Sequence, residues 1–145
     1  MACGRTGRSR DRISMRRLSL LLIGSVCLAL APDDAARHKE WMDTAQDVKD
    51  DLKDALDAKL APKAVEHATK LAGIGKQEEA YWKKASQKDA IDLAQKNRAA
   101  AEQIATAAKA GHFDQALQAY GNLEATCRAC HDLHPEKRQA ASTAK

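Results

Sequence analysis

The chain has 145 residues, the length of one ordinary domain. Its 44% of apolar residues includes 30 alanines and only five aromatic residues, and 30% of all residues are charged. A chain rich in Ala, Lys, Asp and Glu and poor in Gly, Pro and β-branched residues favours helix and argues against a β-sandwich or barrel. Because large side chains are few, the sequence predicts a thin core that something other than side chains helps to fill.

The net charge of +4 is distributed unevenly along the chain. Residues 1–31 carry six Arg and one Asp, whereas residues 32–145 carry 18 Lys and Arg against 19 Asp and Glu. The second region is therefore close to neutral. Since it lacks a basic surface, we do not expect it to bind nucleic acid.

Residues 1–31 have the features of a signal peptide. Arg16 and Arg17 precede an apolar run over residues 18–31, which has the length of a signal-peptide core and is too short to predict a membrane span. Export to the periplasm is the expected consequence, without stable membrane insertion once the peptide is cleaved.

The mature domain is predicted over residues 32–145. Met15 is a more conventional start than Met1, which would leave residues 1–14 untranslated. At the other end, we expect a frayed tail from about residue 136.

Two helices are predicted first, from apolar residues spaced three and four apart. One covers about residues 33–59, and its first two residues, both Asp, suit an N-cap and first turn. The next covers residues 62–84 and begins at Pro62, a favourable first-turn residue. Within it, Gly73 and Gly75 mark either a kink or a close helix contact.

Two more helices follow. One begins near Ser86, with Asp89 three residues later in an approximate capping box, and extends to about residue 110. The last covers residues 114–134, where Pro135 stops it. Four helices joined by short loops predict an all-α protein, an antiparallel up-down-up-down four-helix bundle.

The most informative segment is Cys127-Arg128-Ala129-Cys130-His131. A C-x-x-C-H string is the attachment site for c-type haem. Two thiols add across the two vinyl groups of the porphyrin, and the histidine supplies a nitrogen ligand to the iron. On a helix, positions i, i+3 and i+4 share one face, so all three groups meet one flat ligand. The sequence therefore predicts one covalent haem c, held by Cys127 and Cys130 with His131 on the iron.

The cysteine pair has three alternative uses. A structural zinc site would need four ligands, with His134 and a distant His completing it, but a His directly after the second Cys is atypical of zinc fingers. A thioredoxin-like redox pair normally follows a strand, and no strand is predicted. A plain structural disulfide also remains as an alternative.

The stretch from Ala99 to Arg138 resembles the C-terminal part of class II c-type cytochromes, the cytochromes c′ and their low-spin relatives. Ala-Gly-His-Phe-Asp precedes the last helix, and Cys-Arg-Ala-Cys-His-Asp stands near its end. Over residues 33–98 the similarity is only architectural. The resemblance implies a four-helix bundle with haem near one end, His131 as proximal ligand, and a possible homodimer. It also implies redox or diatomic-gas chemistry outside the cytoplasm, and leaves Arg128 either near a propionate or simply exposed.

Bundle geometry narrows the choice of a sixth iron ligand. The last helix ends at the haem, together with the start of the first helix, the end of the second and the start of the third. Helices of about 20 residues are about 30 Å long, so His67 and His112 are predicted at the opposite end. The residues that remain at the haem end are His38, Trp41, Met42, Tyr81 and Trp82.

Met42 is the predicted distal ligand, because a thioether suits haem iron and raises its potential. His38 lies four residues earlier on the same face and is an alternative. In a third arrangement Met42 only fills the core, or Trp41 occupies the distal face, and the iron is five-coordinate. His134 is expected to be a capping or surface residue.

These residues predict an extracytoplasmic one-electron carrier whose partners are redox proteins. The alternative is a five-coordinate protein, similar to cytochrome c′, that binds diatomic gases such as NO or CO. An enzyme is not expected, because no acid–base pair or nucleophile accompanies the motif.

Overall fold

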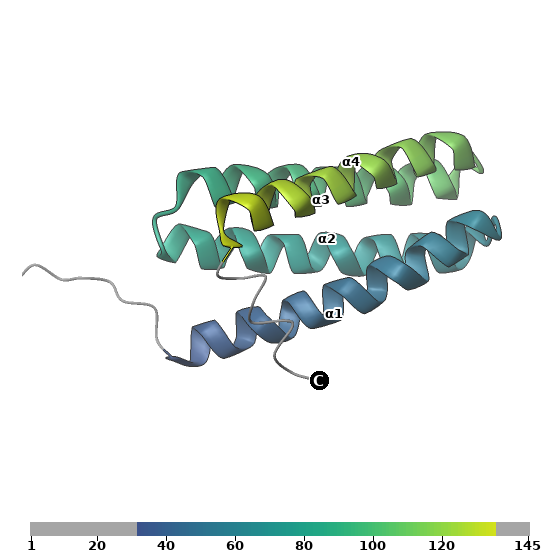
Figure 1. Cartoon of the computed structure of the whole chain (residues 1–145). Helices are drawn as coiled ribbons and strands as arrows, with labels where there is room; N and C mark the ends of the chain where they lie inside the picture. Colours follow the sequence, from purple (N-terminus) through teal and green to yellow (C-terminus); the bar gives the residue numbers. More distant parts are fainter. Residues whose placement is uncertain (1–31, 136–145) are drawn as a thin grey trace, which may run out of the picture.

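The computed structural model describes residues 32–135, and over that range the chain folds into helices and loops without strands (Figure 1). Three-residue loops join the helices. The four predicted helices and the all-α class are confirmed, with each boundary within two residues of its expected place. The predicted signal peptide and the tail from residue 136 lie outside the described residues. The helices are α1 (Pro32–Asp57), α2 (Ala61–Lys84), α3 (Lys88–Lys109) and α4 (Phe113–Leu133).

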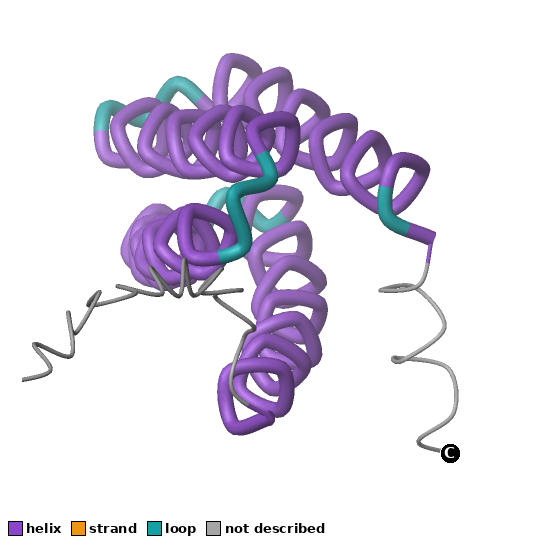
Figure 2. The backbone as a smooth tube through the Cα atoms, turned by 90° about the vertical axis from the view of Figure 1, so that its left-hand side faces the viewer, coloured by secondary structure: helices purple, strands orange, loops and turns teal. Residues whose placement is uncertain are grey.

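Successive helices run antiparallel, so the start of α1 and the end of α4 lie at the same end of the bundle (Figure 1). There α1 diverges from α2, whereas at the opposite end the two helices approach closely, and the end-on view in Figure 2 shows α1 crossing away from the others. This divergence separates the N-terminal half of α1 from the C-terminal half of α4. Within the described range, no helix is long and apolar enough to cross a bilayer.

The middle residue of each three-residue loop has a positive φ: Lys59 at 54°, Ser86 at 57° and Gly111 at 75°. The next residue in each case donates its backbone N–H to a carbonyl five residues back, as in Gln87 to Trp82 at 3.2 Å. This is the Schellman arrangement that ends a helix. The predicted capping box is therefore wrong, because Ser86 terminates α2 and α3 begins after Gln87 without a side-chain cap.

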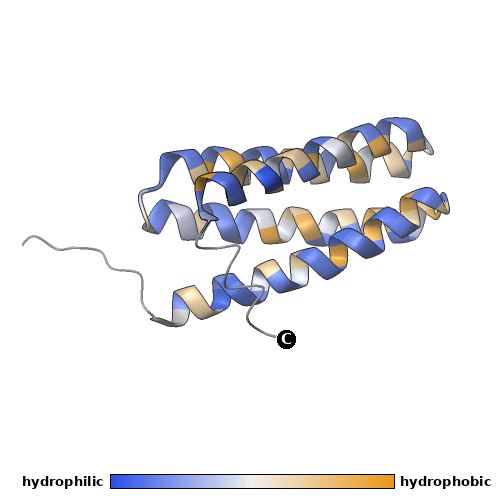
Figure 3. Ribbon diagram, viewed as in Figure 1, coloured by the Kyte–Doolittle hydropathy of each residue, from blue (hydrophilic) through white to orange (hydrophobic). Residues whose placement is uncertain are grey.

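The core consists of two clusters. The larger one fills the middle and far end of the bundle and is rich in alanine, and its largest fully buried side chains are Leu52, Leu56, Ile104 and Leu123. The smaller one, at the end where α1 diverges, contains Tyr81, Trp82, Ala90 and Ala94, with Trp41 packed against it. Figure 3 colours most residues of α1 as hydrophilic, and its buried residues are few: His38, Val48, Leu52, Ala55 and Leu56.

A polar cluster and a glycine bring α2 and α3 together. Glu79 is buried, accepts hydrogen bonds from Lys83 Nζ (2.6 Å) and Gln95 Nε2 (2.9 Å), and lies 3.4 Å from Arg98 Nη1. The bond from Lys83, followed by that from Gln95, lowers the pKa of the Glu79 carboxyl below its usual value. A Cβ added at Gly75 would lie 3.1 Å from Arg98 Cβ and 3.3 Å from its Cα. Gly75 therefore marks a close helix contact, the second of the two alternatives (a kink or a close contact) that the sequence left open.

Two matched substitutions test this contact. At the exposed Gly73, a Cβ would meet nothing within 4 Å, so Gly73→Leu should stabilise α2 by about 0.5–1 kcal/mol through helix propensity. Gly75→Leu should instead destabilise the fold by about 1–3 kcal/mol, because the backbone of Arg98 cannot move aside easily. Urea unfolding followed by circular dichroism measures both, and similar changes for the two variants would contradict the contact.

Tyr120 links α4 to α1. Its side chain is buried, and its hydroxyl donates to the backbone oxygen of Lys49 at 3.3 Å. Burial, followed by the nearby charge of Glu124, raises the pKa of Tyr120 from 10 to about 12. The folded protein thus keeps this hydroxyl protonated over a range where the unfolded chain ionises it.

The consequence is a loss of stability as pH rises. The stability that Tyr120 contributes is fully present below pH 10 and is lost as the pH rises toward about 12, because only the unfolded state releases the proton in that range. Tyr120→Phe removes this dependence. The difference in unfolding free energy between the wild type and Tyr120→Phe should therefore fall between pH 8 and pH 11, measured by urea unfolding. A constant difference would show that the hydroxyl ionises equally in both states.

Candidate functional site

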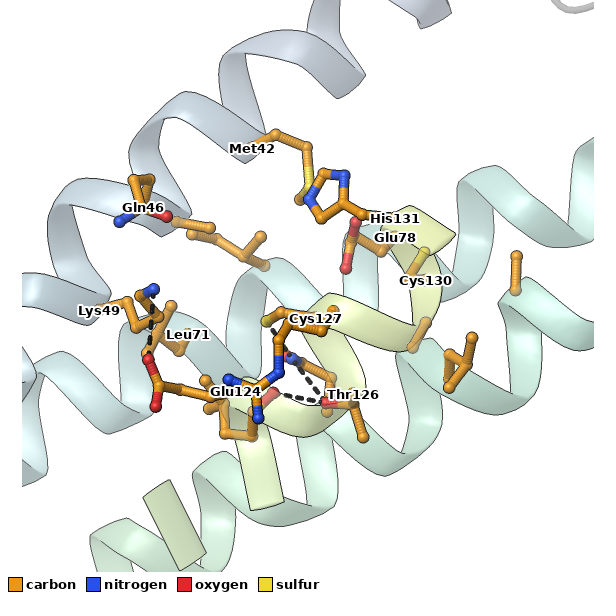
Figure 4. Close-up of a pocket in the computed structure, with 18 of the residues that line it drawn as sticks. Met42, Gln46, Lys49, Leu71, Glu78, Glu124, Thr126, Cys127, Cys130 and His131 are labelled. Carbon is orange, nitrogen blue, oxygen red and sulfur yellow. Dashed lines mark hydrogen bonds and ion pairs between the residues drawn. The ribbon is translucent and has the colours of Figure 1, made fainter. Parts of the chain in front are cut away.

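A cavity of about 830 Å³ lies at the end of the bundle where α1 diverges, and residues from all four helices line it (Figure 4). Its volume falls within the range of about 300–1,000 Å³ that is usual for small-molecule and cofactor sites. Both core clusters contribute to its wall. The apolar lining includes Leu71, Ile74, Ala90, Leu93, Ala94 and Leu123.

The three residues of the C-x-x-C-H motif line this cavity together. Cys127, Cys130 and His131 lie on the last two turns of α4, and each is half-buried. Because α4 is a continuous helix through all three positions, their side chains leave it on one face, as the spacing predicts. Figure 4 shows the two sulfur atoms and the imidazole of His131 on that part of α4.

Met42 lies across the cavity from the motif. It is half-buried on α1 and lines the same space. In Figure 4 its side chain and that of His131 point toward one another. The structure therefore brings together the two residues that the sequence predicted as the proximal and distal ligands.

His38, one turn before Met42, also lines the cavity but is held in the smaller core cluster. Only 4% of the residue is exposed, and its ring stacks on Tyr81 at 4.2 Å and meets Trp82 edge-on at 5.4 Å between centroids. Its Nε2 is buried, makes no hydrogen bond to any described residue, and lies 3.6 Å from Glu78 Oε1. The imidazole is thus confined by aromatic rings on α2.

The other predicted histidines and aromatics do not line the cavity, with Trp82 the exception. His112 lines a separate groove between α3 and α4, and neither it nor His67 lines the cavity, as expected. Trp41 also lies outside the lining, so it does not cover a distal face there.

His134 occupies the C-cap position of α4, in agreement with the expectation that it is a capping or surface residue. Its ring packs on Trp82 at 4.8 Å, with Nε2 3.3 Å from Asp89 Oδ2.

Cys127 has a defined polar partner on the neighbouring helix. Asn97 on α3 directs Nδ2 toward Cys127 Sγ at 3.2 Å and toward Thr126 Oγ1 at 3.2 Å (Figure 4). Burial, with a smaller contribution from the charge of Glu78, raises the pKa of the Cys127 thiol, and the charge of Lys49, followed by the bond from Asn97, opposes that rise. The thiol is therefore kept neutral but oriented.

Charged side chains surround the mouth of the cavity. Lys49 Nζ lies 3.7 Å from Glu124 Oε1, and Arg128 is exposed at the rim. Acidic side chains also contribute to the lining, at Asp43, Asp47, Glu78 and Glu124. Either cation could therefore pair with a ligand carboxylate, in competition with the acidic neighbours.

Sequence reasoning missed Glu78, Lys49 and Asn97 as residues of the site. On α2, Glu79 is buried against α3, whereas its neighbour Glu78 reaches the cavity. The one available signal was the spacing of Asn97, which stands three residues after Ala94 and four before Ala101, both of them buried. An amide among alanines on a buried face indicates a polar partner opposite.

Within residues 32–135, no three His, Cys, Asp or Glu side chains form a group that could hold a metal ion by themselves. Comparison of the chain with known protein families, with curated proteins and with solved structures gave no match. The functional assignment therefore depends on the residues around the cavity.

Proposed function

We propose that this chain is an extracytoplasmic c-type haem protein that carries one electron at a time. The observation that supports this most strongly is the opposition of Cys127, Cys130 and His131 on α4 to Met42 on α1, across one cavity. Two thiols and an imidazole on one helix face are the donor set that covalent haem attachment requires. Export to the periplasm and redox proteins as partners belong to the same proposal.

The cavity suits a flat, largely apolar cofactor. Its apolar wall includes Ala90 and Ala94, whose short side chains leave room where larger residues would otherwise fill the core. In this assignment, Cys127 and Cys130 would each form a thioether to one vinyl group and His131 would bind the iron. Lys49 and Arg128, at the mouth of the cavity, would be available to the propionates. When bound, the haem supplies a metal centre that alternates between ferric and ferrous states.

Met42 is the better distal ligand of the two candidates on α1. Its side chain points toward His131, whereas the ring of His38 is packed between Tyr81 and Trp82 and faces Glu78. Using His38 would require breaking that aromatic packing. Thioether ligation also gives the higher reduction potential of the two.

A second function is favoured by the position of Met42 itself. The residue is only half-buried and lies on the part of α1 that diverges from the bundle. Methionine has a flexible side chain and α1 is held by few neighbours there, so Met42 can stay away from the iron. An iron without a sixth protein ligand would bind diatomic gases such as NO or CO. Sixth-ligand occupancy separates this function from electron transfer.

Met42→Ala tests the assignment of the distal ligand. The wild type should keep a six-coordinate iron that does not bind carbon monoxide. Met42→Ala should expose the sixth position, so carbon monoxide should cause a large change in the absorption spectrum of the reduced protein. His38→Phe, which keeps an aromatic ring in the same packing, is the control and should behave as the wild type. A wild type that binds carbon monoxide as readily as Met42→Ala would support gas binding. A response in His38→Phe alone would assign the ligand to His38.

A further inference from the structure

The amide of Asn97 is the centre of a small hydrogen-bond network that joins α3 to the motif on α4. Its Nδ2 donates to Cys127 Sγ and to Thr126 Oγ1, both at 3.2 Å. Thr126 Oγ1 in turn donates to the backbone oxygen of Leu123 at 2.7 Å. The dashed lines in Figure 4 follow these contacts. The network fixes the direction of the Cys127 side chain relative to the cavity.

An amide suits this position for a chemical reason. The NH₂ group of Asn has two hydrogens, so it can serve the sulfur and the hydroxyl at once. Aspartate, with a similar shape, offers only acceptors when ionised, and leucine offers neither donor nor acceptor. The sulfur atom also needs a donor, because the surrounding burial opposes the charged thiolate form.

Attachment of Cys127 to haem is an addition without net oxidation or reduction. The S–H bond breaks and the vinyl double bond opens, a C–S bond forms at one vinyl carbon, and the hydrogen goes to the other vinyl carbon. The sulfur must point at the vinyl carbon with which it forms the C–S bond, and it must carry negative charge as this bond forms. A hydrogen bond from a neutral donor serves both requirements.

We propose that Asn97 is a positioning residue for covalent haem attachment, and that it directs the Cys127 sulfur into the cavity so that the thioether forms there. This inference rests on the proposed function. It assigns a role to a residue outside the C-x-x-C-H string and on a different helix. Without Asn97, a larger share of the protein holds haem through Cys130 alone, with Cys127 unattached.

The test uses the full chain exported from cells that attach haem c, with Asn97→Leu compared with the wild type. Peptide mass spectrometry after alkylation with iodoacetamide counts the thioethers and shows whether Cys127 carries haem or the alkyl group. We expect the share of singly attached protein to rise about fivefold, the factor that corresponds to one ordinary hydrogen bond. The reduced α-band should also move to longer wavelength, because one vinyl group stays conjugated with the porphyrin.

Thr126→Val is the matched control. It removes the other acceptor of the Asn97 amide and leaves the bond to Cys127, so it should give two thioethers as in the wild type. Cys127→Ala supplies the reference spectrum for attachment through Cys130 alone.

The remaining outcomes decide against the inference. If the share of protein with two thioethers is the same in Asn97→Leu as in the wild type, the inference is wrong. Loss of haem from both cysteines would also overturn it, because that result assigns Asn97 to folding rather than to positioning. Absence of haem from the wild type itself would instead refute the proposed function, so the two failures are distinguishable.

Discussion

The close packing of α2 against α3 and of α3 against α4 is the constraint on which the rest of the structure depends. Alanines on the facing surfaces and the close approach at Gly75 let these helices come together with few large side chains. α1 joins them fully only at the far end, where Leu52 and Leu56 are buried. A chain with so little side-chain volume cannot fill both ends of a four-helix bundle, and the cavity occupies the end that is left.

The polar groups at this end are arranged around the cavity rather than dispersed. Glu78 faces His38, Asn97 faces Cys127, and Lys49 pairs with Glu124 at the mouth. His38 is buried and the other polar residues are half-buried. Removing polar groups from water is costly unless they have partners, so their concentration beside the motif indicates a site and not only a core. In the proposed function, the negative charge of Glu78 in the cavity wall would favour the ferric state, and Met42 as a ligand would favour the ferrous one. The two residues would then set the potential in opposition.

The sequence predicted the helices, the bundle and the gathering of Met42, Cys127, Cys130 and His131 correctly, because helical periodicity fixes which residues share a face and antiparallel connection fixes which ends meet. It failed at Ser86, since a positive φ at a serine leaves no mark in composition or spacing. It also did not single out Glu78, rather than its neighbour Glu79, as a residue of the site. The two are adjacent on one helix, and the rotation that sends one to α3 and the other to the cavity depends on Gly75 and Arg98, contacts that only the packed structure defines. Haem, ligation and periplasmic export stay predictions.

The most direct test of the central claim is the absorption spectrum of the chain exported from cells competent to attach haem c, recorded oxidised and reduced after extraction with acidified acetone. The account predicts a sharp α-band on reduction that survives the extraction, because the haem is bonded to Cys127 and Cys130. It also predicts that the band is absent from extracted protein in which both cysteines are alanine. A wild-type protein without haem absorbance under these conditions would contradict the account and return the cysteine pair to the zinc and disulfide alternatives.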